Sequence, residues 1–66
     1  MLSARNRIRG RIVSVRLGTI MAEVEVKAGE FDLVSVITRR SAEALALKEG
    51  DEVTVVIKST EAMIEK

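Results

Sequence analysis

The sequence predicts a small, mainly β domain that contains one short helix. Apolar and polar residues alternate over several runs, which is the period of strands with one buried face. Glycines separate most of these runs, as turn residues separate the strands of a sheet. The apolar residues are almost all aliphatic, because the chain of 66 residues has one Phe and no Trp or Tyr. The predicted order is β-β-β-α-β-β, in a single domain over residues 1–66.

The first strand is predicted over residues 7–17, with the sequence RIRGRIVSVRL. Arginines alternate with apolar or small residues in its first half, and the second half is mostly apolar. This change of pattern predicts a bend or bulge, either at Gly10 or at the pair Ile12 and Val13. Gly18 then begins the turn to the next strand.

The second strand, over residues 20–28, has the clearest alternation in the chain. One face of this strand is mostly charged and is expected to contact water. Gly29 and Glu30 form the hairpin turn that follows. The face expected in the core consists of Ile20, Ala22, Val24, Val26 and Ala28.

Two further strands, over residues 31–37 and 52–58, are apolar on both faces. In so short a chain, the second face of each strand is expected to pack on another subunit. A chain of 66 residues is also close to the lower size limit for a stable monomer, and the absence of Cys excludes disulfides. The sequence therefore predicts a homo-oligomer.

A short helix is predicted within residues 38–51, between these two strands. Thr38 or Ser41 would cap its start. Leu45 and Leu47 would face the core, and Gly50 would end the segment.

A last short strand is predicted over residues 62–65. Five strands around a small helix predict a small barrel like those of the oligonucleotide/oligosaccharide-binding fold, an OB-like barrel.

The composition argues against an enzyme. The chain has no His, Cys or Tyr, and therefore lacks the commonest general base and the thiolate and imidazole metal ligands. No stretch is apolar enough for a membrane span, and residues 1–20 show no signal-peptide pattern. We expect a non-catalytic, cytoplasmic protein without a catalytic cofactor or a bound metal ion.

Three places offer the donors that a small oxyanion requires. Residues 3–5, SAR, supply a hydroxyl, backbone N–H groups and a guanidinium, and residues 58–60, KST, supply an ammonium and two hydroxyls. Thr38 adds a hydroxyl at a strand end beside the start of the helix. The alternative is that these are a frayed terminus, a solvated strand end and a helix cap.

A second hypothesis concerns Arg7, Arg9 and Arg11, which share one face of the first strand and could bind nucleic acid. Barrels that bind single strands stack bases on aromatic side chains, and Phe31 is the single aromatic residue here. The net charge of +1 gives no general attraction to polyanions. These arginines could instead pair with Glu23 and Glu25 of the next strand, and a nucleic-acid partner is not expected.

The chain resembles the molbindins, small molybdate-binding proteins that consist of one Mop domain of the TOBE group. The resemblance lies in LSARN at residues 2–6, in GRIVSV after it, and in VITRRSAEALALKEGDEVTVVIKST at residues 36–60. LKEGDEV alone is weak evidence, because it recurs in AbrB-type DNA-binding hairpins. The order of SARN, ITxxS and VIKST over nearly the whole chain is much more specific.

The resemblance implies an OB-like barrel that assembles into a hexamer, a trimer of dimers. It also implies non-catalytic binding of molybdate or tungstate between subunits, for intracellular molybdenum storage and homeostasis. Delivery or sensing of the anion stays an alternative, because the same domain occurs in transport ATPases and transcriptional regulators. The oxyanion-binding residues that the resemblance implies are Ser3, Ala4, Arg5, Thr38, Lys58 and Ser59.

Overall fold

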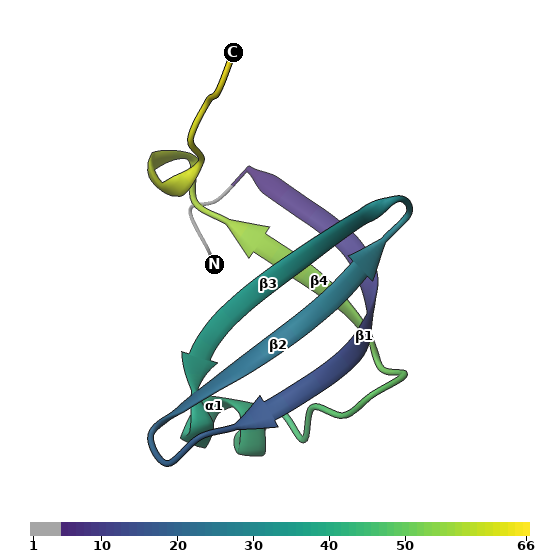
Figure 1. Cartoon of the computed structure of the whole chain (residues 1–66), viewed down its shortest axis with the longest axis vertical. Coiled ribbons are helices and arrows are strands. Elements are labelled where there is room, and N and C mark those ends of the chain that lie inside the picture. The colour runs from purple at the N-terminus through teal and green to yellow at the C-terminus, as the bar shows by residue number, and fades with distance from the viewer. Residues whose placement is uncertain (1–4) are drawn as a thin grey trace.

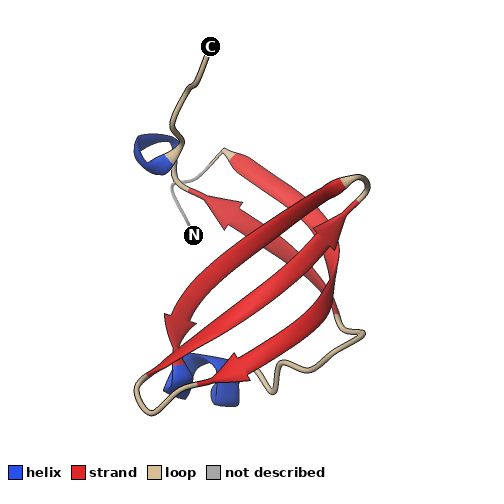
Figure 2. Ribbon diagram, viewed as in Figure 1, coloured by secondary structure: helices blue, strands red, loops and turns tan. Residues whose placement is uncertain are grey.

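The computed structural model describes residues 5–66, which form one curved antiparallel sheet with a short helix at one end (Figure 1, Figure 2). The strand order in the sheet is β3-β2-β1-β4. This architecture confirms the predicted class, mainly β with one short α-helix. The elements in chain order are β1 Asn6–Leu17, β2 Met21–Ala28, β3 Phe31–Thr38, α1 Arg39–Ala44, β4 Glu52–Ile57 and the 3-10 helix η1 Ser59–Glu61.

A bulge in β1 decides which side chains of its second half enter the core. The register with β2 shifts between Ile12 and Ser14, so Val13 is the extra residue of the bulge. Because the alternation restarts after Val13, Val15 packs against the core and Arg16 is exposed. The second of the two predicted positions for this irregularity is therefore correct.

The core lies on the inner face of the curved sheet. Ile12, Val24 and Val26 are at most 3% exposed and form its centre. Partly buried side chains from β1, β3, β4 and the loop after α1 surround them: Val15, Leu33, Ile37, Leu47, Val53 and Val55. Ala22 and Ala28 are buried as predicted. The core is small because a single curved sheet encloses it from one side.

The predicted core position of Ile20 is wrong. Its side chain is 74% exposed, because β2 begins one residue later, at Met21. Ile20 lies instead in the turn between β1 and β2, where its carbonyl oxygen accepts a hydrogen bond from the backbone N–H of Arg39 at 2.7 Å. This hydrogen bond holds the turn between β1 and β2 against the start of α1.

The helix α1 begins as predicted. Thr38 is the N-cap, and its Oγ1 accepts a hydrogen bond from the backbone N–H of Ser41 at 3.1 Å. Ala42, which is 3% exposed, is the buried residue of α1. The cap therefore fixes where β3 ends and where the helix turns across the end of the sheet.

The end of α1 differs from the prediction at Leu45, which is 67% exposed. The helix ends at Ala44, and Ala46 adopts a left-handed φ of 51°. The chain therefore turns before Leu45 can face the core from a continued helix. The backbone N–H of Leu47 then donates to the carbonyl of Ala42 at 3.1 Å, and Leu47 packs against the core as predicted. Gly50, with a φ of 94°, lies in the final turn before β4.

The predicted last strand over residues 62–65 is wrong for the single chain. After η1, residues 62–66 have no strand assignment, and the side chains of Met63 and Ile64 are 96% and 97% exposed. Figure 1 shows this segment, in yellow, leading away from the sheet. A strand requires a neighbouring strand to bond its backbone groups, and this segment has none within residues 5–66.

Neither helix found within residues 5–66 is long and apolar enough to cross a membrane.

Candidate functional site

Two of the candidate segments meet at one end of the β1–β4 pair. Asn6 pairs with Ile57 in the antiparallel ladder, so Arg5, just before β1, and Lys58, just after β4, lie at the same end of the sheet. Ser59 follows as the first residue of η1. Ser3 and Ala4 lie outside the described residues. The structure therefore brings together Arg5, Lys58 and Ser59.

Asn6 holds these two segments together. Its side-chain Nδ2 donates to the carbonyl oxygen of Ile57 at 3.2 Å. The bond fixes the chain immediately before Lys58 to the start of β1. The donor pattern of the sequence did not indicate Asn6 as a part of the site, although it stands in the SARN motif. The signal was the position of a side-chain amide directly after the proposed anion-binding residues.

The turn after β4 gives the candidate site its shape. Lys58 has an extended backbone with φ −66° and ψ 141°, and its carbonyl oxygen accepts from the N–H of Glu61 at 2.9 Å. η1 carries no side-chain cap at its start. The lysine side chain is exposed at the end of a strand, where an anion can approach it.

Thr38 lies at the other end of the sheet. It pairs with Met21 at the start of β2, next to the turn that follows β1. Its Oγ1 is 2.8 Å from the Oγ of Ser41, so the two hydroxyls share a hydrogen bond in addition to the helix cap. An open depression of about 550 Å³ lies beside it, lined by Thr19, Ile20, Thr38, Arg39, Arg40 and Glu43.

One chain cannot place Thr38 and Lys58 on the same anion. The two residues lie near opposite ends of the 12-residue strand β1, because Lys58 follows the Asn6–Ile57 pair and Thr38 pairs with Met21, next to the Leu17–Ala22 pair. The molecule itself is 34 Å long. Hydrogen bonds to one small anion require donors within about 3 Å of its oxygens. The candidate residues thus form two separate half-sites in the single chain.

The two arginines at the start of α1 differ in their contacts. Arg39 is held by Glu43, at 3.4 Å from Nε to Oε2, and by the carbonyl of Gly18 at 3.2 Å. Arg40 is exposed at the edge of the depression. Arg39 therefore has a structural role and connects α1 to the turn after β1. The guanidinium of Arg40 is the charge that faces solvent.

The arginines of the first strand do not pair with Glu23 and Glu25 as predicted. Arg9 and Arg11 contact Glu52 on β4 instead, at 3.3 and 3.5 Å. The register explains the difference, because Arg11 lies opposite Lys27 on β2 and opposite Glu52 on β4.

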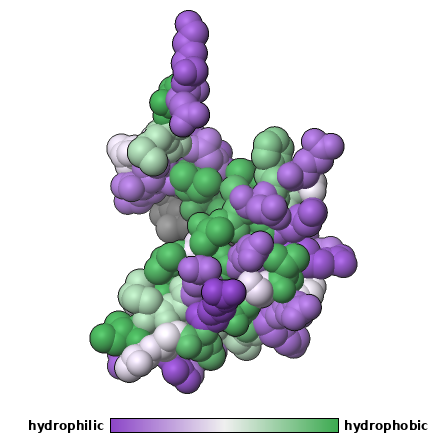
Figure 3. Space-filling model, viewed as in Figure 1, coloured by the Kyte–Doolittle hydropathy of each residue, from purple (hydrophilic) through white to green (hydrophobic). Residues whose placement is uncertain are grey.

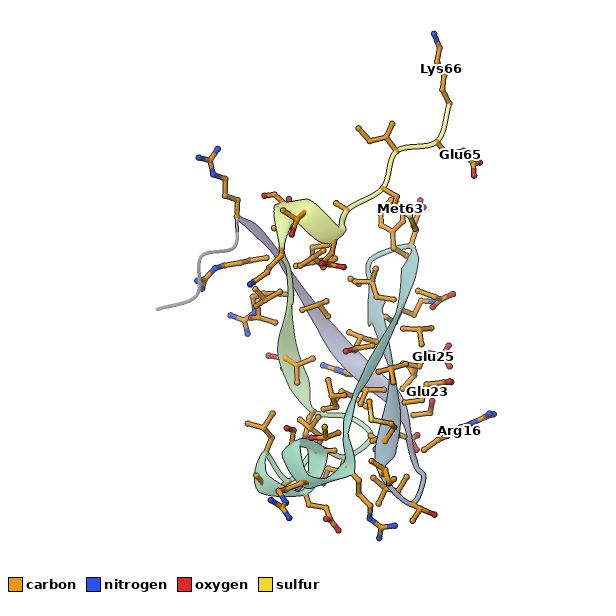
Figure 4. The ribbon with its side chains drawn as sticks, turned by 90° about the vertical axis from the view of Figure 1, so that its left-hand side faces the viewer. Arg16, Glu23, Glu25, Met63, Glu65 and Lys66 are labelled. Carbon is orange, nitrogen blue, oxygen red and sulfur yellow. The ribbon has the colours of Figure 1, made fainter. Side chains whose placement is uncertain are left out.

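Beyond the bulge, Glu23 lies opposite Arg16, and Glu25 accepts from the hydroxyl of Ser14 at 3.4 Å. Figure 4 shows Arg16, Glu23 and Glu25 pointing away from the same side of the sheet. Arg9 and Arg11 therefore both pair with an acidic residue of β4. The nucleic-acid hypothesis gains no support from these arginines.

Over residues 5–66, no three acidic side chains gather where they could hold a metal ion. The chemistry of the two half-sites is that of hydroxyl, N–H and cationic donors, which suit an anion rather than a cation.

Comparison with known proteins finds a family model and relatives that match nearly the whole chain. The family model of the TOBE domain matches residues 2–64. Molybdenum-pterin-binding protein 1 of Clostridium pasteurianum is 47% identical over 64 residues, which is 96% of this chain and 94% of that protein.

Two solved structures share the fold. A molybdate-binding protein from Sporomusa ovata superposes with a TM-score of 0.95 at 33% identity, and the match covers 100% of this chain and 98% of that one. The cytoplasmic molybdate-binding protein ModG, with molybdate bound, superposes with a TM-score of 0.84 at 37% identity. That match covers 88% of this chain and 42% of ModG.

Proposed function

This chain belongs to the TOBE domain family, and on that premise we propose that it binds molybdate or tungstate without changing the anion chemically. The observation that carries the proposal is the likeness, over nearly the whole chain, to proteins described as molybdenum-pterin-binding or molybdate-binding. The absence of His, Cys and Tyr agrees with a binding role, because no step of anion exchange needs a nucleophile or a general base.

The proposed binding groups at one half-site are those of Ser3, Ala4, Arg5, Lys58 and Ser59. A tetrahedral dianion is held by several N–H and O–H donors and by one or two cations. The pairing of Asn6 with Ile57 supports this assignment, since it keeps the two basic segments at one end of the sheet.

We assign Thr38 to the same anion, but from a neighbouring copy. Its distance along β1 from Lys58 supports this arrangement, because one chain cannot supply both donors. The assembly that we propose is the homohexamer, a trimer of dimers, that the molbindin resemblance implies. Binding sites of this kind exist in the oligomer alone, so anion and assembly stabilise each other.

The proposed cellular role is storage and homeostasis of molybdate in the cytoplasm. The description of ModG as a cytoplasmic molybdate-binding protein supports this location.

Calorimetric titration of the full chain with molybdate tests the function. Hydrogen bonds to a charged group contribute about 1.5 to 3 kcal/mol each, so Lys58→Ala is expected to weaken binding about ten-fold or more. Lys27→Ala is the matched control, because it removes the same side chain from the outer face of β2, away from both half-sites. Its affinity is expected to equal that of the wild type.

Three results would contradict the proposal in different ways. No heat of binding in the wild type would refute molybdate binding itself. Unchanged affinity in Lys58→Ala would remove Lys58 from the site. Native mass spectrometry that finds a number of subunits other than six would refute the hexamer but leave binding intact.

A further inference from the structure

The first half of β1 has a neighbouring strand on one side only. Residues 6–11 pair with β4, and the pairing of β1 with β2 begins at Arg11. Within residues 5–66, residues 6–10 therefore have an open backbone edge on the side away from β4. An open edge carries unpaired N–H and C=O groups, which an added strand can bond.

Three arginines lie on the outer face of this half-strand and form an arginine row. Arg7, Arg9 and Arg11 are alternate residues, so their side chains share one face at a spacing of about 6.7 Å. All three are exposed. The residues opposite them on β4 are, in the same order, Val56, Thr54 and Glu52. The row therefore has one acidic neighbour on β4.

This single carboxylate contacts two of the three arginines. Oε2 of Glu52 lies 3.3 Å from Nη2 of Arg9, and Oε1 lies 3.5 Å from Nη2 of Arg11. Arg7 takes part in no salt bridge within residues 5–66. The row thus keeps an excess of positive charge. The side chains of both ion pairs are more than 60% exposed, and such pairs are weak, so a carboxylate from a partner can replace Glu52.

An open depression of about 420 Å³ lies where the end of β2 meets β1. Its lining consists of Arg9, Gly10, Arg11, Lys27, Gly29 and Glu52. Three of these six residues are cations and one is an acid, so the lining suits the carboxylates of a ligand. Figure 3 shows hydrophilic side chains, in purple, gathered on the right-hand side of the view, where Figure 1 places the β2–β3 hairpin and the bend of β1.

The open edge and the arginine row together suit an extended acidic peptide. In an added strand, acidic residues at alternate positions share one face at the spacing of the arginines, and therefore lie opposite them. A nucleic acid has no peptide groups to pair with the open edge. Barrels that bind single strands also stack bases on aromatic side chains, and Phe31 is the single aromatic residue of the chain.

We propose that residues 6–10 of β1 are the docking site for an extended acidic segment of a partner protein. The segment adds to the open edge as a strand and places its carboxylates against the arginine row. Because β1 begins beside the end of β4, the docked segment lies next to the half-site of Arg5 and Lys58. The docking itself depends on β1 and does not rest on the proposed anion binding.

Fluorescence anisotropy with a labelled peptide of alternating Glu and Val tests the docking, on the full chain and without added anion. Arg7→Glu is expected to weaken binding about ten-fold or more, because it places a carboxylate opposite those of the peptide. This variant leaves both ion pairs of Glu52 in place. Arg40→Glu is the matched control, since it makes the same change of charge beyond the other end of β3, and its affinity is expected to equal that of the wild type.

Four results would overturn the proposal. The first is that the wild type does not bind the peptide, and the second is an equal loss of affinity in Arg7→Glu and Arg40→Glu. The third is displacement of the peptide by molybdate, which would assign the peptide to the anion half-site. The fourth is binding of a single-stranded oligonucleotide but not of the peptide, which would identify a nucleic acid as the partner.

Backbone hydrogen exchange then locates the bound peptide. An added strand is expected to slow the exchange of the N–H groups of residues 6–10 that face the open edge several-fold, because they gain hydrogen bonds. A peptide of the same sequence that is N-methylated at alternate residues, on the edge that faces β1, is expected to lose binding. Equal binding of the methylated peptide would refute strand addition. Slowed exchange on β3 or β4 alone, the two strands that end the sheet order, would refute the assignment to β1.

Discussion

Gly10 lies against β2, and its missing side chain is a packing requirement. A Cβ added there would be 2.6 Å from Cγ1 of Val26 and 2.8 Å from the carbonyl oxygen of Lys27. Neither distance is compatible with normal van der Waals contact, and the carbonyl belongs to a strand that cannot move independently. The residue is therefore fixed by the tertiary approach of two strands, and not by a turn.

At the residue scale we predict that Gly10→Ala destabilises the fold by about 1 to 3 kcal/mol, the usual cost of overpacking. Urea unfolding of Gly10→Ala, Val26→Ala and the double variant measures it. Part of the cost should disappear in the Val26→Ala background, because the methyl group in closest contact is gone. Equal costs in both backgrounds would mean that Val26 is not the obstacle.

At the element scale, the bulge in β1 determines which of its side chains face the core, and the cap of α1 determines where β3 ends. Val13 is the extra residue that lets Ile12 and Val15 both reach the core. Thr38 ends β3 and begins α1 with one side chain. Each device lies at the junction between two regular stretches, which is why the flanking periodicity alone indicates roughly where it occurs.

We also predict that Thr38→Ala lowers the free energy of unfolding by about 1 kcal/mol in anion-free protein, because the N–H of Ser41 loses its cap. Thr38→Ser keeps the hydroxyl oxygen and should cost much less. Denaturant titration of the two variants checks this prediction. A loss in Thr38→Ser as large as that in Thr38→Ala would assign the effect to the methyl group instead.

At the scale of the whole molecule, the stability of the fold is expected to depend on assembly, because the sheet is open. The fully buried side chains are few, and apolar residues on β3 and in the C-terminal segment are exposed in the single chain. Homo-oligomers whose contacts complete a core gain stability by mass action.

We therefore predict that the melting temperature rises with protein concentration, which calorimetry over a wide concentration range would detect. Molybdate should raise it further, and to a similar extent in low and moderate salt. A melting temperature independent of protein concentration would show that the single chain is stable alone.

Part of the candidate site could be predicted from the sequence. The residue types of an oxyanion site were recognisable at residues 3–5, at Thr38 and at residues 58–60 because donors and cations are evident from their chemistry. The pairing of Arg9 and Arg11 with Glu52 was not, since β1 meets β4 across more than forty residues of chain. Ile20 and Leu45 were assigned to the core from periodicity, and both lie one residue beyond the end of an element.

Sequence patterns were sufficient to predict the four strands of the sheet, the hairpin turn at Gly29 and the cap at Thr38, because these follow from side-chain period and backbone preference over neighbouring residues. Tertiary contacts place Thr38 and Lys58 at opposite ends of the sheet and leave residues 62–66 leading away from it, without a strand partner within residues 5–66. Both outcomes depend on how strands distant in sequence are arranged in space, which local patterns do not encode.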